Sequence, residues 1–131
     1  MKVAVDTHVL VRAVVRDDAR QADIAAKLLT DADLVAVALP CLCEFVWVLR
    51  RVYGFTAADV SGAIRALLDA ANTETNRPAA EAGLVILEAG GDFADGVIAF
   101  EGQWLGGETF VSFDQKAVAL LNAQGRSTLL L

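Results

Sequence analysis

Short apolar runs of strand length alternate with helix-forming segments along the whole chain, and this alternation constrains the fold most. The strand-like runs are residues 2–5, 34–39, 109–112 and 127–131, and a short edge strand is expected at 72–75. Parallel strands need a long crossover connection, which a helix supplies. We therefore predict the α/β class, with a small, mainly parallel sheet flanked by helices in a three-layer α/β/α arrangement.

Capping residues, prolines and glycines delimit the helices between these runs. Pro40 opens one helix and Gly54 ends it, while Thr56 begins a sequence that resembles a capping box. Asp92 is the expected N-cap of a later helix. The predicted helices cover about residues 20–29, 40–53, 57–71, 78–89 and 93–105, and a last one follows Asp114.

The length of 131 residues and the hydrophobic content of 56% suit a single domain over residues 1–131 with its own core. No apolar run approaches the roughly 20 residues of a membrane span. Asp6 interrupts the amino terminus before a signal-peptide core can form. We expect a cytoplasmic, bacterial-type protein without membrane association, in which Cys41 and Cys43 are reduced packing residues.

The formal net charge of -6 argues against a broad basic surface that grips nucleic acid. Two bound divalent cations would offset four of the acidic charges, which weakens the objection. Direct DNA binding by so acidic a chain is not expected.

Four carboxylates lie where one predicted element gives way to the next. Asp6 and Asp114 follow strands, and Glu44 and Asp95 lie near helix starts. In open parallel sheets, active sites collect beyond the carboxyl ends of the strands. Four hard oxygen ligands favour Mg²⁺ or Mn²⁺ over zinc. Two-metal sites of this kind position water for in-line attack on a phosphodiester, so no nucleophilic side chain is needed.

Several of these residues also have a purely structural interpretation. Asp114 is well placed to cap the last helix, and Glu44 could be an exposed helix residue. Of Asp92 and Asp95, which share a helix face, we assign the cap to Asp92 and the metal to Asp95.

Basic residues near the acids are candidate phosphate contacts. Lys116 is the basic residue nearest the predicted site in sequence. Arg12 begins a strip of arginines at four-residue spacing, for which pairing with neighbouring aspartates such as Asp17 or Asp23 is an equally good explanation.

Four segments together resemble a PIN domain: Val5–Leu10, Pro40–Glu44, Asp92–Ala99 and Ser112–Lys116. Their order and spacing, and the length of the chain, are most similar to the VapC toxins of type II toxin–antitoxin modules. The similarity covers essentially the whole chain. One departure is His8, where the family more often has Asn or Ser.

The resemblance implies an endoribonuclease that depends on Mg²⁺ or Mn²⁺, with Asp6, Glu44, Asp95 and Asp114 as catalytic metal ligands. Thr7 and Ser112 would support these acids, as would Asp92. The resemblance further implies an RNA substrate, a cognate VapB-type antitoxin that often supplies an arginine to the acidic pocket, a homodimer, and a toxin–antitoxin hetero-oligomer.

Apolar residues of the first helices are candidates for such an interface, although core packing explains them equally well: Leu28, Leu29, Val46, Trp47, Leu49 and Tyr53. Trp47 and Trp104 are expected to be core or interface anchors and not base-stacking platforms.

Two other functions are compatible with parts of the pattern. A phosphotransferase of the haloacid dehalogenase type also has an Asp after its first strand, but it needs a second Asp at the position that His8 occupies. A catalytically inactive PIN scaffold that only binds a partner is the non-enzymatic alternative.

Overall fold

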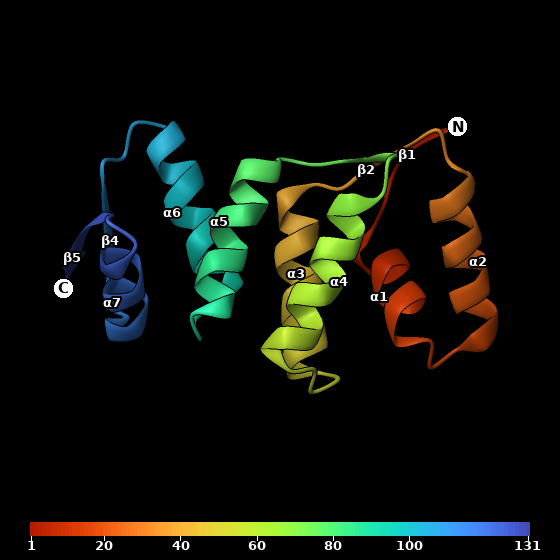
Figure 1. Cartoon of the computed structure of the whole chain (residues 1–131), viewed down its shortest axis with the longest axis horizontal. Coiled ribbons are helices and arrows are strands. Elements are labelled where there is room, and N and C mark those ends of the chain that lie inside the picture. Colours follow the sequence, from red (N-terminus) through yellow and green to blue (C-terminus); the bar gives the residue numbers. More distant parts are fainter. The chain divides into compact units, whose positions relative to one another are not determined.

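The computed structural model describes all residues from 1 to 131 and divides into two compact units, Met1–Asn76 and Arg77–Leu131, each of which is described by itself. Along the chain, each strand is separated from the next by one helix or by two consecutive helices, and the colours of Figure 1 follow this order. All strand pairs are parallel. The predicted α/β class is confirmed.

The first unit contains a three-stranded sheet in the order β1-β2-β3. Its strands are β1 (Lys2–Ala4), β2 (Leu34–Ala36) and β3 (Thr73–Glu74). In the register of β1 and β2, Val3 lies opposite Val35, which is almost completely buried. The strands are shorter than the apolar runs that predicted them, although Val37 still donates a backbone hydrogen bond to the carbonyl oxygen of Glu74.

Four helices belong to the same unit: α1 (Thr7–Val15), α2 (Ala19–Asp31), α3 (Leu39–Arg51) and α4 (Ala57–Asp69). Helix α1 packs against α2 and α3, and α3 packs against α4. Figure 1 shows these helices in red to yellow-green. The largest side chains of the core come mainly from α3, where Leu42, Phe45 and Leu49 are at most 1% exposed.

Helix α1 was not predicted, because the sequence analysis began the first helix at residue 20. Its segment contains four valines, and β-branched residues lower helix propensity. Tertiary packing outweighs that cost, since Leu10 and Val11 are buried in the core. The helix ends at Arg16, whose positive φ of 58° separates α1 from α2.

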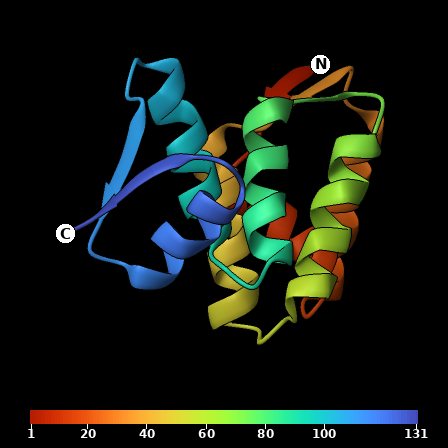
Figure 2. The same ribbon diagram turned by 60° about the vertical axis from the view of Figure 1, so that its left-hand side comes forward.

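The second unit contains helices α5 (Arg77–Glu88), α6 (Phe93–Trp104) and α7 (Gln115–Ala123). Its two strands, β4 (Thr109–Ser112) and β5 (Ser127–Leu130), form a parallel pair and run side by side in Figure 2. Helix α7 is the crossover between them and packs on both strands. The predicted helices and strands of this unit all occur, with ends that differ by only a few residues.

Gly96 in α6 allows α5 and α6 to approach each other closely. A Cβ atom at this position would clash with the carbonyl oxygen of Ala82 and lie 2.8 Å from the Cα of Gly83. Phe93 in turn lies over Gly83, where an added Cβ would be 2.6 Å from the nearest atom of its ring. A glycine inside a helix costs about 1 kcal/mol relative to alanine. Close packing of the two backbones accounts for it here.

The structure also decides part of the interface prediction. Val46 and Leu49 are core residues of the first unit, 4% and 0% exposed, so they offer no surface to a partner. Trp47 is 58% exposed, which excludes a core role.

None of the helices combines the length and the apolar character that crossing a membrane requires.

Candidate metal centre

Asp6 stands between β1 and α1, as predicted, and caps the helix. Its backbone is extended, and its Oδ1 accepts a hydrogen bond of 2.6 Å from the backbone N–H of Thr7. The side chain is exposed. The end of the strand therefore fixes the backbone of Asp6, and the start of the helix fixes its carboxylate.

Glu44 lies one turn into α3, behind the Pro40 that occupies the first turn of the helix. Its carboxylate is exposed and forms no hydrogen bond or ion pair. The neighbouring side chains Cys41, Leu42 and Phe45 are buried, so Glu44 is the exposed polar residue in this turn of the helix.

Cys41 shows that Asp6 and Glu44 share one neighbourhood. Burial raises the pKa of the Cys41 thiol, a hydrogen bond with Thr7 opposes that rise, and the charges of Asp6 and Glu44 add to it. A thiol that senses both carboxylates lies close to both. Neither Cys41 nor Cys43 forms a disulfide.

Asp92 and Asp95 lie at the start of α6 and divide their roles. Asp92 is the N-cap, and its Oδ1 accepts a hydrogen bond of 3.2 Å from the backbone N–H of Ala94. This confirms the cap assigned to Asp92. Asp95 is in the first turn, is partly buried, and its carboxylate accepts no hydrogen bond.

The electrostatic environment of Asp95 is unfavourable to its negative charge. Partial burial raises the pKa of Asp95, and the charges of Asp92 and Asp114 raise it further. No basic side chain forms an ion pair with it. A partly buried carboxylate surrounded by other carboxylates lacks a compensating cation.

Asp114 caps α7, so the structural role left open for it is confirmed. Its Oδ1 accepts hydrogen bonds of 3.0 Å from the backbone N–H groups of Lys116 and Ala117. Its own backbone N–H donates to Ser112 Oγ over 2.9 Å. Ser112 thus holds the backbone that carries Asp114, and its supporting role in a metal site stays a prediction. The ammonium group of Lys116 is in no ion pair.

The pattern of hydrogen bonds leaves carboxylate oxygens available in both units. Asp6, Asp92 and Asp114 each use only Oδ1 for the cap. Their Oδ2 atoms, and both carboxylate oxygens of Glu44 and Asp95, accept none. Hard oxygen donors of this kind fit Mg²⁺ or Mn²⁺. Within neither unit do three or more histidine, cysteine or acidic side chains gather closely enough to hold a metal ion.

The structure therefore brings the predicted residues together in two sets. Asp6, Thr7 and Glu44 belong to the first unit, and Asp92, Asp95, Ser112 and Asp114 belong to the second. That all four predicted ligands serve one metal site stays a prediction.

Arg12 is held inside the first unit. Its Nε donates to Gln21 Oε1 over 2.6 Å, its Nη1 donates to the hydroxyl of Tyr53, and it forms an ion pair with Asp17 at 3.7 Å. Arg16 pairs with Asp23. These contacts agree with the alternative explanation of the arginine strip, pairing with neighbouring aspartates.

The proximity of the Cys41 thiol to two predicted ligands was not predicted, because Cys41 was expected only to be a packing residue. Cys41 and Glu44 are three residues apart, and this spacing places side chains on the same face of a helix. The spacing could have shown that the thiol neighbours Glu44. Nothing local in the sequence indicates its proximity to Asp6.

Parallel strands joined by helices, with acids at strand ends and helix starts, define an α/β protein of the kind in which polar groups collect at one sheet edge. The family model for the PIN domain matches residues 3–120, so the chain belongs to the PIN domain family. No curated protein matches the chain. PIN domains are typically metal-dependent nucleases, which use divalent ions such as Mg²⁺.

Proposed function

We propose that this protein is a Mg²⁺- or Mn²⁺-dependent endoribonuclease and the toxin of a VapBC-type toxin–antitoxin module. One observation supports the nuclease above all: the four acids of the PIN pattern, Asp6, Glu44, Asp95 and Asp114, all keep carboxylate oxygens that accept no hydrogen bond. The similarity of the four sequence segments to VapC toxins supports the more specific assignment.

In this proposal the four acids are the metal ligands, and the caps orient three of the side chains involved. The N–H groups at the starts of α1, α6 and α7 hold Asp6, Asp92 and Asp114 by one oxygen. Asp95 has no such anchor, and it is the acid that gains most from a cation, because its neighbours are negative.

A bound divalent cation would polarise the phosphate and lower the pKa of the attacking water, as is general for metal-dependent phosphodiester hydrolysis. The protein then has two tasks, to hold the carboxylates and to offset the charge of the RNA. Lys116, whose backbone lies beside Asp114 and whose side chain is in no ion pair, is the proposed phosphate contact. Arg12 can serve as a second contact only by leaving Asp17 and Tyr53.

The partners in the proposal are a VapB-type antitoxin and a second copy of the chain. The exposed indole of Trp47 on α3 supports an apolar contact there, since an interface core is enriched in such side chains.

The catalytically inactive PIN scaffold is the second candidate function. It differs from the nuclease in one measurable respect, because it would not hydrolyse RNA.

The test is cleavage of mixed cellular RNA by the purified full chain with Mg²⁺ or Mn²⁺. Asp6→Asn and Asp95→Asn remove one ligand from each unit, and each should lower the rate at least about a hundredfold, because metal stabilisation is worth several kcal/mol. Asp18→Asn is the matched control, since Asp18 is also an N-cap aspartate but lies at the start of α2.

Equal cleavage by all four proteins would overturn the metal assignment. Absence of cleavage by the wild type with either metal would favour the inactive scaffold. The toxin assignment is tested separately by co-purification with the product of the adjacent reading frame, and a lasting failure to associate would contradict it.

A further inference from the structure

The end of α6 carries an open pocket that none of the proposed metal ligands reaches. Its volume is about 300 Å³, and Phe100, Gln103 and Trp104 line it. These residues stand at i, i+3 and i+4, so they project from one face of the helix. Trp104 is 79% exposed, although an indole is among the side chains that bury the most apolar area.

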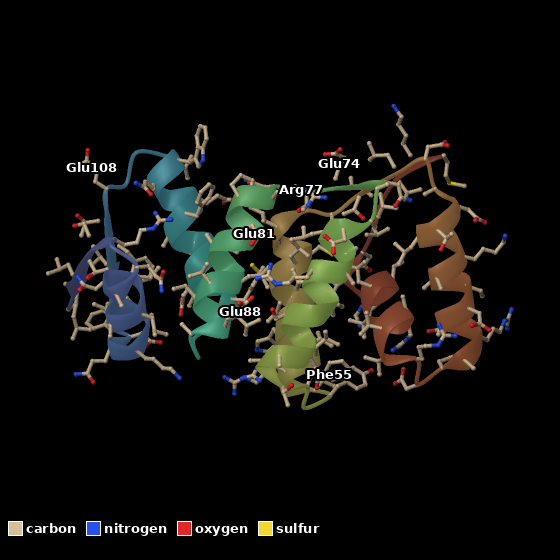
Figure 3. The ribbon with its side chains drawn as sticks, viewed as in Figure 1. Phe55, Glu74, Arg77, Glu81, Glu88 and Glu108 are labelled. Carbon is tan, nitrogen blue, oxygen red and sulfur yellow. The ribbon has the colours of Figure 1, made fainter.

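A cation from another element contacts two of the residues that line the pocket. The guanidinium of Arg126, just before β5, lies 6.0 Å from the centroid of the Phe100 ring and donates a hydrogen bond to Gln103 Oε1. The amide of Gln103 and the remaining N–H groups of Arg126 present hydrogen-bonding groups beside two aromatic faces. No acidic side chain lines the pocket, and Glu108, after the end of α6, points outward (Figure 3).

We infer that this pocket binds one unpaired nucleobase of the RNA, an inference that rests on the proposed nuclease function. Aromatic side chains that stack on splayed bases, with planar donors and acceptors at the base edge, are the usual means by which proteins recognise single-stranded RNA. The volume is at the lower end of small-ligand sites, so it suits one planar ring system and not several nucleotides.

The charge of the second unit favours a base over a phosphate as the group that is bound. This unit has seven acidic and three basic side chains. Away from Lys116 and a bound metal this net negative charge disfavours a phosphate, whereas stacking and hydrogen bonds to a neutral base need no basic surface. The only cation at the pocket, Arg126, is already oriented by Phe100 and Gln103.

The pocket lies on the same helix as Asp95, so its distance from that acid is set by helix geometry. Gln103 is eight residues beyond Asp95, which corresponds to roughly 12 Å along the axis and about 80° around it. Trp104 lies farther around the helix. A base bound there is therefore away from Asp95, and only a base that is not paired within a duplex can enter the pocket. The pocket thus selects single-stranded RNA.

Tryptophan fluorescence tests this directly, in EDTA so that no cleavage occurs. In a Trp47→Phe background Trp104 is the only indole, and a hexanucleotide of adenosine should quench it. A filter-binding affinity for the same probe should fall about five- to tenfold or more in Trp104→Ala and change less than about twofold in Trp104→Phe, because any aromatic ring can stack. The ratio between these two variants should not change with salt, since stacking releases no counterions.

Equal affinity of Trp104→Ala and Trp104→Phe would overturn the inference, whatever the nuclease activity. If Trp104→Ala changed the mass of the oligomer in solution but left the RNA affinity unchanged, the inference would also be overturned. The pocket would then be a protein contact. Quenching of Trp104 by the free nucleoside adenosine in the Trp47→Phe background would support it even if the wild type cleaved no RNA, and in that case only the nuclease proposal would fail.

Discussion

At the scale of single residues, the capping aspartates have a double task. Asp6 and Asp114 each satisfy N–H groups at a helix start with Oδ1 and keep Oδ2 for another ligand. From the sequence alone, capping and metal binding are competing explanations for Asp114. A carboxylate has two oxygens, so the observed cap does not exclude the metal.

Substitutions at Asp114 should separate the two tasks. Asparagine caps helices about as well as aspartate, so Asp114→Asn should change the free energy of unfolding by less than about 0.5 kcal/mol and still lower RNA cleavage strongly. Asp114→Ala should lose about 1 kcal/mol as well as activity. Urea denaturation and the cleavage assay measure the two effects. Full activity in Asp114→Asn would restrict Asp114 to its capping role.

At the scale of elements, most of the architecture follows from local signals. Gly54, Asp92 and the glycines after α5 and α6 mark helix ends that the structure confirms. Helix α1 was missed because its valines favour strands locally and only packing against α2 and α3 makes the segment helical. The lesson is that local propensity fails where burial decides the outcome.

The contact between α5 and α6 gives a prediction at this scale. Gly96→Ala should destabilise the protein by about 1–3 kcal/mol, because its Cβ would meet the backbone of Ala82 and Gly83. Gly102→Ala is the matched control in the same helix, since nothing lies within 4 Å of its added Cβ. It should leave stability unchanged or raise it by up to about 1 kcal/mol.

Thermal denaturation of both variants provides the measurement. A Gly96→Ala protein as stable as Gly102→Ala would show that the two helices are not held as closely as the glycine suggests.

At the scale of the whole molecule, the acids are distributed equally, with Asp6 and Glu44 in one unit and Asp95 and Asp114 in the other. The PIN resemblance predicted the identity of these residues and their order in the chain. Their grouping into a common site is not a local property, because it depends on contacts between segments far apart in sequence. That part of the prediction needs a measurement of metal binding.

Binding of Mg²⁺ or Mn²⁺ should raise the melting temperature of the full chain, by an amount that grows with the logarithm of the metal concentration. The rise should disappear in both Asp6→Asn and Asp95→Asn. Loss in only one of them would mean that the acids of a single unit bind the metal.

The same measurement has a predictable pH dependence. The pKa of Asp95 is raised, so the metal-free protein loses stability as the pH rises from about 4 through that pKa, where the charge forms. Metal needs the charged form, so the metal-induced rise should shrink as the pH falls through the same range. Asp95→Asn should lack both effects, and a wild-type shift that is independent of pH would contradict the role of Asp95.

The capping roles also limit which substitutions could accompany the loss of nuclease activity during evolution. A carboxylate that closes a helix cannot drift freely to any residue, because most replacements damage the scaffold before selection on catalysis is felt. Asparagine or serine at the positions of Asp6, Asp92 and Asp114 would be tolerated most easily. Homologues that have lost nuclease activity and only bind a partner should therefore carry asparagine or serine at these capping positions.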